Sequence, residues 1–487
     1  MANSRVCVAV TGRTMTDIRA NRNAVEGAEL VEMRLDTVDR PDAAGALEGR
    51  RGAVIVTCRA AWEGGHFTGS EEERQRILED ALDRGAEYVD VEARAAFAGD
   101  LIRSRRGRNV ILSSHIYGPP PSDLEAQWAA LQASGAEIAK LAVEAHSLTD
   151  TLRVMALADG ARAETTPGSQ GRVLIAMGDA GAASRVLATR LGNAWTYAGD
   201  NVAPGQIGAR RLLDEFRFRH ITSDTAVFGV VGNPVMHSLS PVMHNAGFRC
   251  LGIDAVYLPL LAADAADFVR FAKGIGMAGA SITAPFKVAL MESADELDPL
   301  ATRVGAINTL DMRDGRWRGY NTDVHGFTAP LLRRLAEQPA GRKLRASLLG
   351  AGGAARAVAV ALADLDADVT VCARRPEAAH TIAELAGGTV GELPPARGSW
   401  DLLVNSTSWD GDAALNSPMA GAALDGRLVY ELLYVPAVTR LLADARAAGC
   451  TTIGGLEMLV AQAEKQFEIW TGQAPPQGLF QQAAGQP

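Results

Sequence analysis

Short apolar runs recur along the first 200 residues of the chain, and polar stretches of helical character separate them. Runs of this length and composition are typical of buried strands, and their alternation with helices favours a parallel sheet. Eight strand–helix units within about 200 residues predict a compact (β/α)₈ barrel. The predicted strands are Val6–Val10, Leu30–Leu35, Ala53–Cys58, Tyr88–Glu92, Val110–Ser113, Ile138–Val143, Val173–Met177 and Trp195–Tyr197.

Polar residues gather at the carboxyl ends of these predicted strands, where (β/α)₈ barrels carry their chemistry. Any one of them could be a packing or surface residue, but their shared position at one end predicts a site. They are Glu32 and Arg34 on the second strand, Arg59 after the third, His115 after the fifth, Lys140 on the sixth, and Arg185 and Gln206 in the loops after the seventh and eighth.

Lys140 is the only lysine in the first 272 residues, in a chain that has five lysines against 43 arginines. It lies in the apolar stretch Glu-Ile-Ala-Lys-Leu-Ala-Val, which reads as a buried strand. A lysine in apolar surroundings can lose its proton and act as a nucleophilic amine, whereas an arginine keeps its charge. The residue therefore suggests a Schiff base with a carbonyl substrate. The alternative is a lysine whose stem is buried at a strand end and whose amine reaches water.

The composition restricts the partners of the chain. Its net charge is −9, its hydrophobic content is 47% and its charged content is 22%, which are typical of a globular protein. An acidic balance argues against nucleic acid or an anionic membrane as the main partner. The five cysteines are far apart without a Cys-x-x-Cys pair, and we expect reduced thiols rather than disulfides or zinc ligands. With no membrane-length apolar run and a first strand beginning near Arg5, we expect a cytoplasmic protein and no membrane partner.

A second domain is predicted after a closing helix at Ile207–Phe218 and a short polar connector at residues 220–224. A new strand begins at Ala226, and a Pro-punctuated loop follows it. In this loop Ser238 and Ser240 precede a predicted helix, so their hydroxyls and the helix amides could bind an anion. Alternatively, Ser240 only caps the helix ahead of Pro241.

Lys287 and Asp323 lie at the ends of two further predicted strands. A lysine beside an aspartate can relay a proton to a carbonyl oxygen. A solvated salt bridge is the alternative for this pair.

A cofactor site is predicted where the strand Leu344–Leu349 is followed by Gly350-Ala-Gly-Gly-Ala-Ala355 and a helical run to Ala363. Glycines in this strand–turn–helix context allow a dinucleotide pyrophosphate to approach the helix N-terminus. The next predicted strand, Val369–Cys372, ends at Ala373-Arg374-Arg375 without an acidic residue. Arginines there suit the 2′-phosphate of NADP, so NADPH is favoured over NADH.

Residues 1–220 resemble the type I 3-dehydroquinate dehydratases. The matching segments are Val-Glu-Met-Arg-Leu-Asp (31–36), Thr-Cys-Arg-Ala-Ala-Trp-Glu-Gly-Gly (57–65), Ser-Ser-His (113–115), Ile-Ala-Lys (138–140), Ala-Ser-Arg (183–185) and Ala-Pro-Gly-Gln (203–206). The resemblance implies that Lys140 forms the Schiff base, that His115 is the general acid and base, and that Glu63 orients His115. It implies substrate binding by Glu32, Arg34, Arg59, Arg185 and Gln206. The chain departs from the family at Ile116, where Asp is frequent, and at Val202, where Ser is frequent and a hydroxyl contact is lost.

Residues 226–472 resemble the shikimate dehydrogenases. Further matching segments are Ser281-Ile-Thr-Ala-Pro-Phe-Lys287, Gly305-Ala-Ile-Asn-Thr309, Gly319-Tyr-Asn-Thr-Asp323, Asp401-Leu-Leu-Val-Asn-Ser-Thr-Ser408, Tyr434-Val-Pro436 and Gly454-Gly-Leu-Glu-Met-Leu-Val-Ala-Gln462. The resemblance implies that Lys287 and Asp323 are catalytic. It implies substrate binding by Ser238, Ser240, Thr283, Asn308, Tyr434 and Gln462, and a cofactor site made of Gly350, Gly352, Gly353, Ala354, Arg374, Arg375 and Met458. Ser281 and Ala373 stand where many members have Asn, and the second departure bears on cofactor choice.

Together the two resemblances imply an α/β protein with an N-terminal (β/α)₈ TIM barrel at residues 1–220, followed by a two-lobed dehydrogenase. Its substrate domain would span 225–325, completed by a helix at about 455–472, and its Rossmann NADP domain would span 326–454. The chain is similar to the plant-type bifunctional enzymes that dehydrate 3-dehydroquinate and then reduce 3-dehydroshikimate with NADPH, so small-molecule substrates are expected. Alternatives are a second half that acts on quinate, one non-catalytic half retained for binding, and a class I aldolase barrel, which would not explain the arginines. Residues 473–487 predict a frayed tail.

Overall fold

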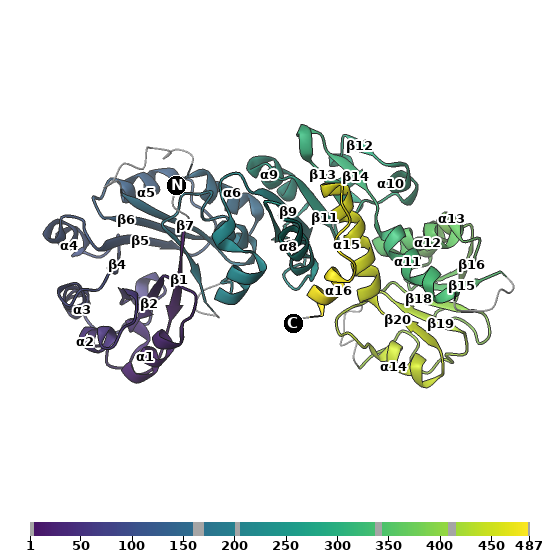
Figure 1. Cartoon of the computed structure of the whole chain (residues 1–487), viewed down its shortest axis with the longest axis horizontal. Coiled ribbons are helices and arrows are strands. Elements are labelled where there is room, and N and C mark those ends of the chain that lie inside the picture. The colour runs from purple at the N-terminus through teal and green to yellow at the C-terminus, as the bar shows by residue number, and fades with distance from the viewer. Residues whose placement is uncertain (1–3, 159–169, 200–204, 337–342, 408–414, 486–487) are drawn as a thin grey trace. The chain divides into compact units, whose positions relative to one another are not determined.

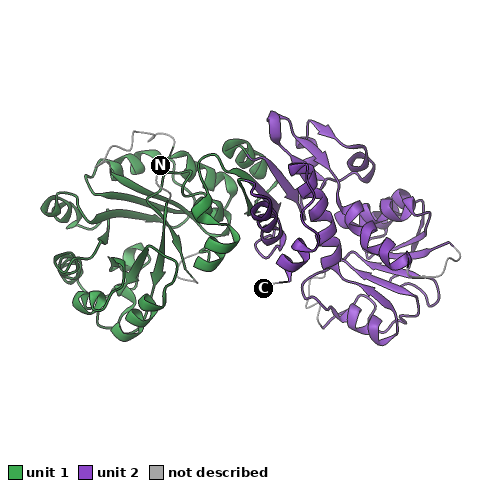
Figure 2. Ribbon diagram, viewed as in Figure 1, with its two compact units in different colours: residues 1–227, 254–276 green, residues 228–253, 277–487 purple. Residues whose placement is uncertain are grey.

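The chain, described by a computed structural model over residues 4–158, 170–199, 205–336, 343–407 and 415–485, divides into two compact units (Figures 1 and 2). Unit 1 comprises Met1–Val227 and Asp254–Gly276, and unit 2 comprises Phe228–Ile253 and Met277–Pro487. Val202 lies outside the described residues.

Unit 1 is built on an eight-stranded parallel sheet in the order β7-β6-β5-β4-β3-β2-β1-β8. This arrangement confirms the predicted barrel. The strand β5 extends beyond its prediction to Ile116, so His115 lies on the strand rather than after it. The strands are β1 (Arg5–Val10), β2 (Leu30–Arg34), β3 (Ala53–Thr57), β4 (Tyr88–Glu92), β5 (Val110–Ile116), β6 (Ile138–Glu144), β7 (Gly171–Met177) and β8 (Trp195–Ala198).

Helices follow the strands along the chain, and the segment that closes the barrel sequence differs from its prediction. Instead of one helix over 207–218, a π-helical turn at Arg211–Glu215 precedes a 3₁₀ turn at Phe218–His220. Arg217 separates them with a left-handed φ of 51°, which a continuous helix does not tolerate. The helices of unit 1 are α1 (Met15–Ala24), α2 (Ala43–Leu47), α3 (Glu71–Asp83), α4 (Ala98–Arg105), α5 (Leu124–Gln132), α6 (Leu148–Ala156), α7 (Ala182–Val186) and α9 (Ala265–Ile275), with the further strand β10 (Ala255–Leu261).

The two ends of the barrel sheet, β7 and β8, meet through an asparagine. The backbone N–H of Ala194 donates to the Arg172 carbonyl at 2.8 Å. The side chain of Asn193, which is buried, accepts from the Leu174 N–H at 3.0 Å and donates to the Leu174 carbonyl at 2.9 Å. One amide side chain thus satisfies both backbone groups of a buried strand residue where the ladder ends.

Asn193→Ala is expected to lower the free energy of unfolding of unit 1 by roughly 2–4 kcal/mol, because it leaves a buried N–H and a buried carbonyl unpaired. Denaturant unfolding followed by circular dichroism measures this. Asn21→Ala is the control, since Asn21 makes one exposed hydrogen bond to the Thr11 carbonyl. Equal stability of the two variants would contradict the role of Asn193 in closure.

Unit 2 contains a mixed sheet in which the strands follow the order β9-β11-β13-β14-β12. β9 and β11 are parallel, whereas β13 is antiparallel to both β11 and β14. The strands are β9 (Ala226–Gly232), β11 (Gly279–Ile282), β12 (Glu296–Leu297), β13 (Thr309–Asp311) and β14 (Arg318–Tyr320). The accompanying helices are α8 (Ser240–Leu251), α10 (Pro299–Val304), α11 (Asp323–Ala336) and α15 (Gly455–Thr471).

The other sheet of unit 2 is fully parallel, in the order β17-β16-β15-β18-β19-β20. This is the doubly wound order of a dinucleotide-binding sheet, and it confirms the predicted Rossmann fold. Its strands are β15 (Arg345–Leu349), β16 (Asp368–Cys372), β17 (Thr389–Gly391), β18 (Leu402–Asn405), β19 (Leu428–Glu431) and β20 (Thr451–Ile453). Its helices are α12 (Gly353–Asp364), α13 (Pro376–Ala386) and α14 (Arg440–Ala447).

The predicted frayed tail is wrong for residues 479–484, which form α16 (Leu479–Ala484). Phe480 is fully buried, and its ring lies edge-on to Phe467 at 5.6 Å and to His244 at 5.3 Å. Burying one aromatic ring in such a cluster stabilises the segment by about 2 kcal/mol or more, which outweighs its Gln- and Ala-rich composition.

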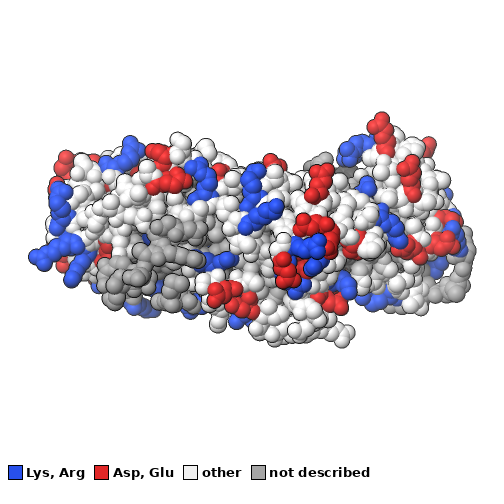
Figure 3. Space-filling view, turned by 90° about the horizontal axis from the view of Figure 1, so that it is seen from above, with Lys and Arg blue, Asp and Glu red and all other residues white. Residues whose placement is uncertain are grey.

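The face of the molecule in Figure 3 mixes basic and acidic side chains rather than separating them into broad fields of one sign. No helix among the described residues is long and apolar enough to cross a membrane. Within the same residues, no cluster of three or more His, Cys, Asp or Glu side chains is arranged to hold a metal ion.

Candidate active sites

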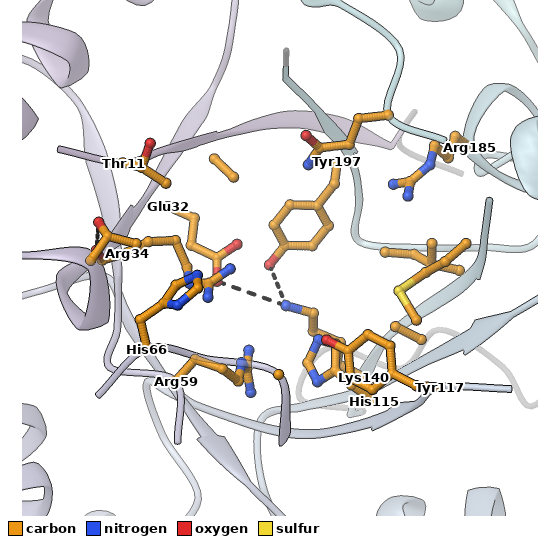
Figure 4. A pocket seen from close by; sticks show the side chains of 17 residues that line it. Thr11, Glu32, Arg34, Arg59, His66, His115, Tyr117, Lys140, Arg185 and Tyr197 are labelled. Atoms are coloured by element: carbon orange, nitrogen blue, oxygen red, sulfur yellow. Dashed lines mark hydrogen bonds and ion pairs between the residues drawn. The ribbon is translucent and has the colours of Figure 1, made fainter. Parts of the chain in front are cut away.

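The barrel holds a cavity of about 260 Å³ at the carboxyl ends of its strands (Figure 4). Seven of the residues singled out in the sequence line it together, which brings side chains from β2, β5 and β6 and from segments that follow β3, β7 and β8 to one place. They are Glu32, Arg34, Arg59, His115, Lys140, Arg185 and Gln206. Glu63 does not line the cavity and lies behind His115.

Lys140 projects from β6 into this cavity and is 3% exposed. Its Nζ donates to Asp90 Oδ2 at 2.7 Å and to Tyr197 Oη at 3.1 Å. Glu32 Oε1 lies 3.9 Å from the same nitrogen. The amine of Lys140, the third residue of β6, therefore has partners from β2, β4 and β8, which hold it in one position without closing it off from the cavity.

Asp90 belongs to an alternating series of buried charges that the sequence analysis missed. Arg59 pairs with Asp90 and with Glu92 at 3.0 Å each, and Arg74 pairs with the far oxygen of Glu92. Burial alone would raise the pKa of Asp90, but the charges of Arg59 and Lys140 hold this pKa well below its usual range. Asp90 is thus an anion beside the amine. The signal was present in the period-2 pattern of Tyr-Val-Asp-Val-Glu on β4, which places residues 88, 90 and 92 on one face of the strand.

Two further arginines, Arg34 and Arg185, line the cavity, and their pKa values are shifted in opposite directions. Arg34 makes two hydrogen bonds to the carboxylate of Asp36, at 2.8 and 2.7 Å. Burial lowers the pKa of Arg34, but the hydrogen bonds and the charge of Asp36 have the larger effect, so the pKa is raised overall. Arg185, on α7, is 2% exposed, and burial lowers the pKa of its guanidinium to about 10. A buried cation of this kind favours an anionic ligand, because a carboxylate would offset the cost of its desolvation.

His115 contacts Glu63 through its ring: Nδ1 and Glu63 Oε1 are 3.0 Å apart, and the same oxygen accepts from the His115 backbone N–H at 2.9 Å. Burial, followed by the charges of Arg59 and Lys140, lowers the pKa of His115 well below its usual value. Burial also raises the pKa of Glu63 to about 7, against the opposing charge of Arg59. A neutral imidazole with Nδ1 held by a carboxylate presents Nε2 as a proton acceptor.

The Glu63 carboxyl is expected to titrate near pH 7 in the folded protein. Because this folded pKa is above the ordinary value of 4.5, the carboxyl contributes stability below pH 4.5, and that contribution is lost as the pH rises through about 7. Carboxyl ¹³C NMR of Glu-labelled protein measures the titration. The signal that disappears in Glu63→Gln assigns it, and a midpoint below pH 5 would contradict the expectation.

Unit 2 holds a second cavity of about 520 Å³, lined by residues of β9 and β11 in the mixed sheet and by residues of α12, of α15 and of the segment that follows β19. It collects the eight predicted catalytic and substrate residues of this half, namely Ser238, Ser240, Thr283, Lys287, Asn308, Asp323, Tyr434 and Gln462. Ala354 and Met458, predicted for the cofactor, line the same cavity.

Lys287 and Asp323 form a hydrogen-bonded ion pair at this cavity. Asp323, at the start of α11, is 4% exposed, and its other oxygen accepts from Asn308 Nδ2 at 2.8 Å. Asn308 in turn approaches Gln462 on α15 at 3.3 Å. Because the pair is embedded in this network, it is not the solvated salt bridge considered as the alternative.

Hydroxyl groups also line the second cavity. Ser240 is buried in the first turn of α8, and its backbone N–H donates to Ser238 Oγ at 3.2 Å. Burial raises the pKa of Tyr434, which a hydrogen bond with Ser238 partly offsets, so the phenol is neutral near pH 7. Ser281, at the position where Asn is common, donates to Gln466 Oε1 at 2.7 Å and also lines the cavity.

The glycine-rich turn joins β15 to α12 as predicted. Gly350 has a φ of 102°, which only glycine adopts without strain, and its N–H donates to the Cys372 carbonyl at 3.0 Å. A Cβ at Gly352 would meet nothing within 4 Å, so the turn presents an open cradle at the N-terminus of α12. The exposed Arg374 and Arg375 follow β16, beside this turn. These residues and Gly353 do not line the second cavity.

Three family models match consecutive parts of the chain. Residues 6–223 match the type I 3-dehydroquinase model, residues 230–310 match the shikimate dehydrogenase substrate binding domain, and residues 455–484 match the shikimate 5′-dehydrogenase C-terminal domain.

Individual relatives agree with these matches. The chain is 35% identical, over 94% of its length and 80% of the relative's, to the chloroplastic bifunctional 3-dehydroquinate dehydratase/shikimate dehydrogenase of Arabidopsis thaliana. Over 54% of its length and 96% of the relative's, it is 42% identical to a shikimate dehydrogenase (NADP(+)) of Citrifermentans bemidjiense. A solved shikimate dehydrogenase in complex with NADP⁺ is 32% identical, covers 54% of this chain and 96% of its own, and has a TM-score of 0.50. A second one, from Aquifex aeolicus, is 31% identical, covers 54% of this chain and 99% of its own, and also has a TM-score of 0.50.

Proposed function

The chain belongs to the family of bifunctional 3-dehydroquinate dehydratase/shikimate dehydrogenases, and we propose that the two cavities described above are the sites of its two reactions. The barrel is a lyase that converts 3-dehydroquinate to 3-dehydroshikimate, and unit 2 is an NADP-dependent oxidoreductase that reduces this ketone to shikimate. The observation that carries the assignment is that each cavity holds a lysine in contact with an aspartate, surrounded by hydroxyl- and carboxylate-binding groups.

In the barrel, we assign the covalent step to Lys140. Its neutral amine attacks the ketone carbon, an Nζ–C bond forms, and the ketone oxygen leaves as water after receiving two protons. The resulting iminium withdraws electrons and acidifies the neighbouring C–H bond. The anionic Asp90, 2.7 Å from Nζ, stabilises the positive charge that appears on this nitrogen.

His115 then acts as the general base and acid. Its neutral Nε2 accepts the proton from carbon, and the imidazolium so formed returns a proton to the departing hydroxyl, which leaves as water. Glu63 holds Nδ1 and stabilises the imidazolium. Hydrolysis of the iminium returns Lys140 and releases the product.

The remaining polar groups of the barrel cavity hold the substrate. Arg185, as a buried cation, suits the carboxylate of the substrate. Glu32, Arg34, Arg59 and Gln206 face the same cavity and suit its hydroxyl groups and ketone. Arg59 has a second task, because its pairs with Asp90 and Glu92 hold these carboxylates in place.

The dinucleotide fits the Rossmann sheet at the open cradle of Gly350, Gly352 and Gly353, with Ala354 and Met458 toward the substrate cavity. NADPH, when bound, supplies a hydride to the ketone carbon. Lys287 gives the ketone oxygen its proton, and Asp323 and Asn308 hold Lys287 in place for this transfer. Ser238, Ser240, Thr283, Tyr434 and Gln462 hold the substrate carboxylate and hydroxyls.

We also propose the domain division expected from the sequence, with the barrel ending at residue 220, a substrate domain at 225–325 completed by about 455–472, and a Rossmann domain at 326–454. The three separate sheets support it, whereas the division into compact units differs by assigning residues 254–276 to unit 1. A cytoplasmic location is proposed as well, supported by five cysteines that are all free.

Two lysine substitutions should separate the activities. Lys140→Arg is expected to abolish dehydration and borohydride trapping of 3-dehydroquinate while sparing reduction, because arginine cannot form the imine. Lys287→Ala is expected to stop reduction while 3-dehydroshikimate accumulates. Both activities are followed in the full-length protein by ultraviolet absorbance, of the enone and of NADPH.

The exposed lysines provide matched controls: Lys273→Arg in unit 1 and Lys343→Ala in unit 2 should leave both activities intact. An active Lys140→Arg variant would exclude the Schiff base. Loss of dehydration in folded Lys287→Ala would reveal a coupling that separate sites do not predict.

Arg374 is expected to select NADPH. A charge-assisted hydrogen bond to phosphate is worth roughly 1.5–3 kcal/mol, so Arg374→Ala should raise the NADPH KM by about tenfold or more and change the NADH KM little. Steady-state kinetics with both cofactors measure the ratio, and Arg397→Ala, which alters another exposed arginine of unit 2, is the control. If the ratio is unchanged, Arg375 or another group contacts the phosphate.

A further inference from the structure

Tyr197 is the one tyrosine that reaches the reacting amine among the described residues, and neither the motifs nor the proposed mechanism above uses it. It lies on β8 beside Cys7 of β1 and is 4% exposed. Its hydroxyl is 3.1 Å from Lys140 Nζ, and the nitrogen lies 4.3 Å from the centre of its ring. Figure 4 shows the phenol pointing across the cavity at the lysine.

The amine needs partners in two states, as an ammonium and as a free base. Asp90, as a carboxylate, can only accept a hydrogen bond, so it serves the ammonium and not the lone pair of the neutral amine. A phenol hydroxyl can do both, because it accepts from N–H and donates to the lone pair after a simple rotation.

We propose that Tyr197 is a catalytic residue of the dehydration, which holds the free amine of Lys140 by donating a hydrogen bond to its lone pair and accepts one when the nitrogen is charged. This inference rests on the proposed role of Lys140. As the Nζ–C bond forms, the lone pair is used and the hydroxyl turns back to accept the remaining N–H. No proton passes to or from Tyr197.

The surroundings keep the hydroxyl of Tyr197 neutral, which is the form that can both donate and accept a hydrogen bond. Burial, followed by the charge of Glu32, raises the pKa of Tyr197 well above its usual value, so the phenol does not ionise. Asp90 is a carboxylate and accepts only, so Tyr197 is the neutral donor among the described groups that hydrogen-bond to the amine. The guanidinium of Arg59 forms ion pairs with Asp90 and Glu92.

Tyr197→Phe tests the proposal, because it removes one oxygen and keeps the ring. We expect kcat for dehydration to fall about tenfold, because the loss of one hydrogen bond raises the barrier by an amount that corresponds to this factor. The KM for 3-dehydroquinate should change less than about twofold. The rate of borohydride trapping at Lys140 should fall in parallel.

Tyr88→Phe is the matched control, since Tyr88 is also buried in the barrel and its hydroxyl donates to Glu137 at 3.1 Å, away from the cavity. It should leave kcat and trapping unchanged, and thermal unfolding should show that both variants fold. Equal trapping and kcat in Tyr197→Phe and the native protein would overturn the proposal. If the native protein is not trapped at Lys140 at all, the proposed function of Lys140 fails instead.

Discussion

The arrangement of the barrel depends on pairing charges that it buries. Lys140, Asp90, Arg59, Glu92 and Arg74 alternate in sign from the cavity to α3, and all are buried. Removing one partner from such a series costs about 3–5 kcal/mol, because its neighbour is left as an unpaired buried charge. The series therefore fixes β3, β4, β6 and α3 relative to one another. It also holds the amine of Lys140, the nucleophile that we propose, beside an anion without any need for substrate.

Unit 2 positions its lysine differently. Lys287 lines the second cavity and is held through Asp323, whose second oxygen accepts from Asn308. Asn308 is in turn held by Thr322 and approaches Gln462, so α11 and α15 share one network. The side chain of Lys140 is 4% exposed and that of Lys287 is 16% exposed. This difference fits the two proposed roles, because a nucleophilic amine needs a dry and fixed position, whereas a proton donor needs contact with a source of protons.

Much of this could be predicted from the chain, since apolar runs locate strands and parallel strands bring their carboxyl ends together. What could not be predicted was which charges face one another. The alternation along β4 shows which face Asp90 shares, but the contacts of Asp90 and Tyr197 with Lys140 depend on the register between strands, which no single strand reveals. The helix α16 was missed because its stability comes from one ring, Phe480, meeting residues more than ten positions away.

The use of lysine and arginine follows from the same physical distinction. Where the chain requires a permanent cation it has arginine, as at the buried Arg59, Arg74 and Arg185. The barrel cavity already holds Arg34, Arg59 and Arg185, so another fixed charge at position 140 would add repulsion without chemistry. An amine is the cation that can lose its proton and form a bond to carbon. A chain with 43 arginines and five lysines thus has two of the five at the positions where we propose that a proton moves.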